Sequence, residues 1–145
     1  MDAQDRGRNA YADSAYYVDV LTHPQALARR LAQLMRATAP KDQAALAQRL
    51  MYGTDWEMII IEGTGTASYL KEFEKVFDSL DADPSLGAQG RLSDRLFGQN
   101  AANYLGLHQG SATRGRIEAF YAQMGVANPQ WLAKVDAPTA KIALN

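Results

Sequence analysis

Two short strand-like segments on either side of a long amphipathic helix constrain the fold of this chain more than any other feature. The first is residues 10–13, and the second is residues 49–52, a largely apolar run that ends at Gly53. Strands in strand–helix–strand order pair in parallel, and parallel sheets are covered on both faces. Two strands alone make a marginal sheet. The pattern therefore predicts a βαβα unit that belongs in a larger parallel sheet.

Most of the remaining chain has helical spacing. Leu27, Leu31 and Leu34 recur at i, i+4 and i+7 after Pro24, so a helix is expected within residues 22–39, with Thr22 able to cap it. Further helices are expected at residues 41–48, 66–80, 92–97, 100–105, 113–124 and from 128 onward. Residues 81–90 are expected to form a loop. The fold class is thus α/β with helices predominating.

Composition excludes several classes of protein. The 145 residues suit one domain, and the net charge of −1 gives no basic surface for nucleic acid. The chain has no cysteine, which excludes disulfides, thiolate catalysis and cysteine-bound zinc. The longest apolar run, residues 58–61, is far shorter than the roughly 18 residues of a membrane span, and no signal peptide is recognisable. We therefore expect a soluble cytoplasmic protein without a membrane partner.

Three segments carry a resemblance to a known family. Residues 49–56 are Arg-Leu-Met-Tyr-Gly-Thr-Asp-Trp, residues 99–107 are Gln-Asn-Ala-Ala-Asn-Tyr-Leu-Gly-Leu, and residues 9–14 are Asn-Ala-Tyr-Ala-Asp-Ser. They resemble, respectively, the eighth strand, the closing helix and the seventh strand of the amidohydrolase superfamily, particularly its decarboxylase-like and lactonase-like branch. The order and spacing of the three segments also agree with that family.

The resemblance implies a partial TIM (β/α)₈ barrel. Such barrels have roughly 250 residues and place their sites at the C-terminal ends of the strands. Residues 1–145 would form a single C-terminal fragment that contains the last two strands with their helices and the C-terminal helices. Residues 1–8 are expected to be frayed, and residues 138–145 are expected to form a loose tail.

The same resemblance implies the site residues. Asp55 matches the carboxylate that binds the catalytic metal, most simply zinc, or accepts a proton from the metal-bound water. Gly53 would let the backbone turn sharply, and Trp56 would wall the substrate pocket. Asp13 and Ser14, at the end of the seventh strand, would face the same pocket. The parent activity would be hydrolysis of a C–N or C–O bond in a small-molecule substrate, or a non-oxidative decarboxylation.

The chain departs from the family in its metal ligands. The family's His-x-His pair and its later histidines are absent, and the two histidines of this chain, His23 and His108, do not follow a predicted strand. A catalytic zinc takes three protein ligands and a water. We therefore expect the chain alone to be inactive, and a chain that holds no cofactor is one alternative.

Simpler structural roles stand beside these functional ones. Asp55 could cap a following helix, because aspartate is a preferred N-cap residue. Glu57 and Glu62 could be pocket carboxylates, although solvated loop residues are commoner. His23 is expected to cap a helix or lie on the surface, and His108 is expected to face solvent. Tyr16 and Tyr17 could line a substrate cleft or serve in packing, and Arg114 and Arg116 are expected on a solvated helix face.

A second function comes from a different class. A partial barrel exposes apolar surface where strands are missing, and large exposed patches mark partner sites. The chain could be a non-enzymatic interaction module that pairs with itself as a homo-oligomer, or with a separately encoded N-terminal half. Phe120, Tyr121 and Trp131 would be its anchors. The alternative is that these side chains fold back onto the core of the chain.

Overall fold

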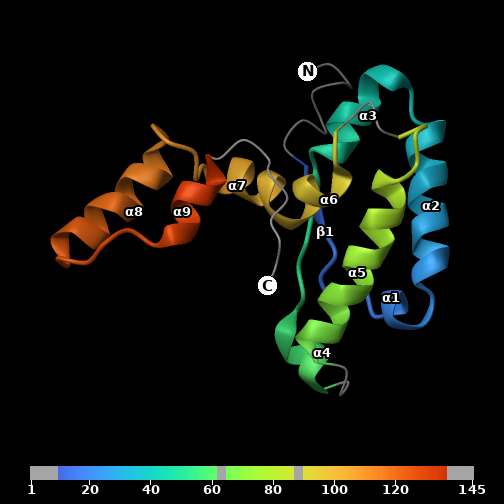
Figure 1. Ribbon diagram of the computed structural model, residues 1–145, viewed down its shortest axis with the longest axis horizontal. Helices are drawn as coiled ribbons and strands as arrows, with labels where there is room; N and C mark the ends of the chain where they lie inside the picture. Colours follow the sequence, from blue (N-terminus) through green and yellow to red (C-terminus); the bar gives the residue numbers. More distant parts are fainter. Residues whose placement is uncertain (1–9, 62–64, 87–89, 137–145) are drawn as a thin grey trace.

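A small parallel sheet lies against a layer of helices. The computed structural model describes residues 10–61, 65–86 and 90–136 (Figure 1). In chain order, the described elements are β1 (Ala12–Asp13), α1 (Asp19–Thr22), α2 (Pro24–Ala37), α3 (Pro40–Ala47), β2 (Leu50–Met51), α4 (Trp56–Ile61), α5 (Thr66–Asp81), α6 (Leu92–Asp94), η2 (Arg95–Gln99, a π-helical turn), α7 (Asn100–Leu105), α8 (Ala112–Gln123) and α9 (Gln130–Val135). The predicted frayed start, the predicted tail and Glu62 lie outside the described residues.

The two strands pair as the sequence predicted. β1 and β2 are parallel, and Ala12 lies opposite Leu50. The amide of Ala12 donates to the carbonyl of Arg49 at 2.9 Å, and the amide of Ser14 donates to that of Met51 at 3.1 Å. The crossover between the strands contains α1, α2 and α3. The described part of the chain is therefore a βαβ unit within a predominantly helical protein.

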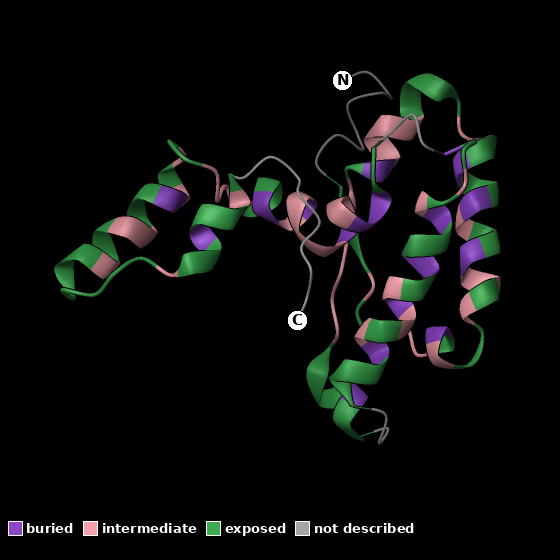
Figure 2. Ribbon diagram, viewed as in Figure 1, coloured by how far each residue is buried: buried purple, intermediate pink, exposed green. Residues whose placement is uncertain are grey.

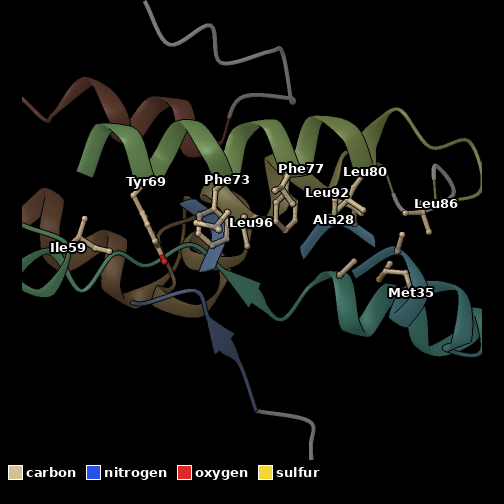
Figure 3. Packing of buried hydrophobic residues seen from close by; sticks show 14 residues of the cluster. Ala28, Met35, Ile59, Tyr69, Phe73, Phe77, Leu80, Leu86, Leu92 and Leu96 are labelled. Carbon is tan, nitrogen blue, oxygen red and sulfur yellow. The ribbon is translucent and has the colours of Figure 1, made fainter. Parts of the chain in front are cut away.

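The core is built around α5. Its buried side chains are Tyr69, Phe73, Val76, Phe77 and Leu80, the apolar face that the helical spacing predicted. They pack against α2 on one side and against η2 and β2 on the other (Figure 3). Tyr52, which follows β2, lies with its ring centroid 5.6 Å from that of Phe73 and 5.3 Å from that of Phe97.

The buried face of α2 differs from the predicted one. Leu34 is 49% exposed, whereas Ala28, Ala32 and Met35 are buried. Leu27 and Leu31 are only partly buried at the margin of the core. α2 packs along α5, whose inward side chains are mostly aromatic. Small alanine side chains allow the two helices to approach closely, and this explains why the face is rotated.

Two short helices were not predicted. α1 contributes Val20, which is fully buried, and α4 forms after Gly53, where no helix was expected. The carbonyl of Asp55 accepts hydrogen bonds from the amides of Met58 and Ile59, at 3.0 and 3.2 Å, and so begins α4. Ile59 is fully buried, and Figure 3 shows it at the end of the core next to Tyr69. Burial of Ile59 explains why this segment is helical.

Two helices stand apart from this core. We call α8, α9 and Asp136 (residues 112–136) the arm, and the elements from β1 to α7 the body. The arm projects from the body beyond α7, and few of its residues are buried (Figures 1 and 2). Gly125, with a φ of +65°, follows the end of α8 as predicted. Among the described helices, none has the length and apolar character needed to cross a membrane.

Candidate functional site

The carboxyl ends of β1 and β2 meet at one edge of the sheet. The hydroxyl oxygen of Ser14 lies 3.1 Å from the amide nitrogen of Gly53 and 3.2 Å from its carbonyl oxygen. Ser14 therefore accepts one hydrogen bond from Gly53 and donates another to it. Two of the three segments that carry the family resemblance are thus in direct contact, at the edge where Asp13 and Asp55 also lie.

Tyr69 holds the chain that leaves β1. Its hydroxyl donates to the carbonyl of Ser14 and accepts a hydrogen bond from the amide of Tyr17 at 2.8 Å. The side chain is fully buried, and burial raises the pKa of the Tyr69 hydroxyl. The helical spacing predicted Tyr69 only as part of the apolar face of its helix. A buried tyrosine hydroxyl normally needs a partner, so its polar role could have been anticipated but the identity of the partner could not.

Asp55 occupies a strained position between β2 and α4. Its φ is +44°, in the left-handed region that non-glycine residues seldom adopt. The side chain is exposed, and its carboxylate has no hydrogen-bond or ion-pair partner among the described residues. The backbone carbonyl begins α4, but no capping bond to the carboxylate is present in this part of the chain. Such strain often accumulates at functional positions.

Two neighbours of Asp55 differ in how they fit the predicted site. Gly53 does not have a positive φ, so the sharp turn expected at Gly53 is made by Asp55 instead. A Cβ at Gly53 would lie 3.4 Å from the amide nitrogen of Ala15. The close approach that this glycine allows is therefore between its own backbone and the chain segment that follows β1. Trp56 is 59% exposed at the start of α4, and its place in a pocket wall stays a prediction.

The described residues do not assemble a metal centre. No group of three histidine, aspartate or glutamate side chains within residues 10–61, 65–86 and 90–136 could hold an ion. Asp13 uses one carboxylate oxygen to accept the amide of Ala15 at 2.9 Å. His23 lies at the N-cap of α2 next to the hydroxyl of Thr22, and His108 bonds to the side chain of Asn103 at 2.7 Å. Zinc ligation by these residues alone is therefore not supported by the geometry.

Asn100 joins the third resembling segment to β2. It is fully buried, and its amide nitrogen donates to the carbonyls of Ala47 at 2.8 Å and Leu50 at 2.7 Å. Because both partners are acceptors, the orientation of the amide is fixed. Its side-chain oxygen has no hydrogen-bond partner in the described structure. The amide of Tyr52 donates to the carbonyl of Leu96 at 3.0 Å, so α7 and η2 cover the edge of β2 that faces away from β1.

The arm contains both a buried cation and an open groove. The Arg114 side chain, expected on a solvated face, is only 9% exposed. It binds Glu118 at 2.6 Å and the carbonyls of Leu107 and Leu132 at 3.1 and 2.8 Å. A groove of about 340 Å³ is lined by Thr113, Arg116, Ile117, Phe120, Tyr121 and Trp131. The groove contains none of the residues predicted for the metal site.

Comparison with known proteins adds no relative. No protein-family model, no curated protein and no solved structure matches this chain.

Proposed function

We propose that this chain is the C-terminal portion of an amidohydrolase-type barrel, to which it contributes the carboxylate of Asp55. The observation that carries the proposal is the parallel pairing of β1 with β2, because it brings Ser14 against Gly53 at the edge where Asp55 emerges. Neighbouring parallel strands are what the seventh and eighth strands of such a barrel require.

Two further features support the proposal, and a third shows what a complete barrel would have to displace. Asp55 is exposed, strained and without a partner among the described residues, as a side chain that awaits a ligand would be. Asn100 bonds the third segment of the resemblance to β2, but it does so at the edge where the first strand of a complete barrel would pair, so that strand would have to displace these contacts. Helices α2 and α5 lie together on one side of the sheet, as the outer helices of a barrel do (Figure 1).

The ligand set limits what the chain can do alone. The described residues supply two exposed carboxylates at the strand ends, Asp13 and Asp55, and no histidine there, whereas tight zinc binding requires about three protein ligands. We therefore propose that the chain has no catalytic turnover by itself. In a complete site, a divalent metal would supply an activated water, and Asp55 would bind the metal or hold the proton.

Zinc titration followed by residue-resolved NMR tests the role of Asp55. We expect weak binding, with the largest amide shifts at residues 13–14 and 53–56. Asp55→Ala should abolish these shifts, whereas Asp42→Ala, in the exposed first turn of α3, should leave them unchanged. Shifts centred on His23 or His108, or a response that survives Asp55→Ala, would remove Asp55 from the proposed site.

Turnover assays test the second part of the proposal. The purified chain with added zinc should not hydrolyse an ester or a lactone, and it should not decarboxylate an aromatic acid. Metal-stimulated turnover that Asp55→Asn abolishes would show that the chain completes its own site, and the proposed inactivity would be wrong.

A second candidate function is an interaction module without catalysis. Phe120 and Trp131 are 58% and 47% exposed, so these two side chains do not fold back onto the core. Aromatic side chains are frequent anchors of protein interfaces. The partner would be another copy of the chain or a separately encoded N-terminal half.

A further inference from the structure

The arm carries an apolar surface that the chain itself leaves uncovered. Four of its large apolar side chains are at least 47% exposed, and they are Phe120, Met124, Val126 and Trp131. Figure 2 shows that most of α8 and α9 is exposed. Two of these side chains, Phe120 and Trp131, line the 340 Å³ groove.

The groove is cationic at its rim. The guanidinium of Arg116 donates to the hydroxyl of Thr113 at 3.1 Å and has no carboxylate partner among the described residues. Lys134 on α9 likewise has no ion pair in this part of the structure. By contrast, the acidic groups of the arm, Glu118 and Asp136, both contact Arg114. The unpaired charges of the arm are therefore positive.

A complementary surface lies at the carboxyl end of the sheet. Trp56, Ile60 and Ile61 on α4 are 59, 56 and 75% exposed, whereas Ile59 of the same helix is buried. Glu57 of α4 is also exposed. Residues 10–23 and 50–61 contain four carboxylates and no lysine or arginine, the carboxylates being Asp13, Asp19, Asp55 and Glu57. This end of the body is apolar and acidic, whereas the arm is apolar and basic.

We propose that the groove of the arm binds α4 of a second copy of this chain, with Arg116 facing Glu57 and Trp131 and Phe120 against the exposed isoleucines. In a reciprocal exchange, the groove of each copy binds α4 of the other copy. The two equivalent contacts form a closed twofold dimer. The proposal does not depend on the metal role of Asp55.

The exposed area favours reciprocal exchange over a single contact. An aromatic side chain has a surface of about 150–250 Å². Scaled by their exposed fractions, the large apolar side chains of the arm expose roughly 400 Å² in total, and those of α4 expose a similar area. One contact would thus be about half the standard interface of roughly 800 Å² per partner, and two contacts would reach that size. A dimer with a dissociation constant on the order of 1–100 μM is expected.

Charge reversal provides the test. Sedimentation velocity from 5 to 500 μM should show concentration-dependent dimerisation of the wild-type chain. Arg116→Glu and Glu57→Arg should each weaken the dimer by about fivefold to tenfold, because like charges then face each other in both contacts. In an equimolar mixture of the two variants, each contact of the mixed dimer again pairs a guanidinium with a carboxylate. The mixture should therefore recover most of the wild-type affinity.

Matched reversals outside the two surfaces serve as controls. Arg29→Glu on α2 and Asp42→Arg on α3 change the same charges at exposed positions and should leave the dissociation constant unchanged. Circular dichroism checks that each variant is folded. A monomer at every concentration would overturn the proposal and would leave the groove for another partner. The proposal would also be overturned if neither charge reversal changed the dissociation constant of the dimer, or if mixing the two variants did not restore the wild-type affinity.

Discussion

Asn100 offers a sharp test of how β2 is held in the fold. Its amide group is fully buried and donates hydrogen bonds to the carbonyls of Ala47 and Leu50. Replacement by alanine removes both donors and leaves two buried carbonyls without partners. Replacement by aspartate keeps the shape but presents two acceptor oxygens to two carbonyl oxygens. The two variants therefore separate the loss of a side chain from the loss of its donors.

The expected magnitudes follow from this geometry. Each unpaired buried carbonyl costs about 1–3 kcal/mol, and Asn100→Ala also removes the side-chain oxygen that has no partner in the described residues, which recovers part of that cost. We expect a net loss of about 2–3 kcal/mol from the free energy of unfolding. Asn100→Asp should lose about 4 kcal/mol or more at pH 7, because burial strongly disfavours the ionised carboxylate.

Urea unfolding followed by circular dichroism measures these losses. Because burial raises the pKa of a carboxyl group, the folded Asn100→Asp variant would bind more protons than the unfolded chain, and its stability should fall as the pH rises from 4 to 7. Asn128→Ala, an exposed position between α8 and α9, is the control and should change stability by less than about 0.5 kcal/mol. A loss below about 1 kcal/mol for Asn100→Ala, or equal losses for the two variants, would refute this account of β2.

Three other predictions test separate features. Burial raises the pKa of Tyr52 to about 12, so the stability linked to its neutral form is complete below about pH 10 and is lost as the pH rises from 10 to 12. Absorbance at about 295 nm should show tyrosines that titrate late, and Tyr52→Phe should lower their number by one, because burial also raises the pKa of Tyr69; ionisation of every tyrosine near pH 10 would contradict the burial. Asp55→Gly should raise the free energy of unfolding by about 0.5–1 kcal/mol in urea, because glycine adopts a φ of +44° without strain, and a loss of stability would argue against strain at this position. Arg114→Met should lower the free energy of unfolding by about 2–3 kcal/mol and reduce the hydrogen-exchange protection of α8 and α9. The control Arg116→Met, at an exposed position, should do neither. Equal protection in the two variants would show that the ion pairs of Arg114 do not hold the arm together.

Regular elements with a strong apolar period were predictable. The helix at residues 66–80 was expected from the spacing of Tyr69, Phe73 and Phe77, and all three side chains are buried. The two strands were also expected, although each pairs over only two residues. The spacing of apolar residues and the flanking glycine or proline residues are properties of the local sequence. Local sequence is therefore sufficient to predict such helices and strands.

The site was predictable only in part. The family resemblance implied that Ser14 and Gly53 lie at the ends of neighbouring strands, and in the structure the hydroxyl of Ser14 bonds to the backbone of Gly53. The sequence did not predict the left-handed backbone at Asp55 or the clamp formed by Tyr69, because both depend on how α4 and α5 pack against the sheet. Whether Asp55 belongs to a metal site stays a prediction.

Sequence alone determined the order of the two strands and the longer helices, the parallel pairing, and the absence of cysteine chemistry. Tertiary structure decided which side chains those helices bury. Leu34 is exposed because close packing on the aromatic side chains of α5 favours the alanine face of α2. Arg114 is buried because α9 folds over it, and its partners are the carbonyls of Leu107 and Leu132 and the carboxylate of Asp136. The exposure of Trp131 has the same origin: burial is a property of surfaces that meet in space, and the pattern along one helix cannot report which surface its neighbour will present.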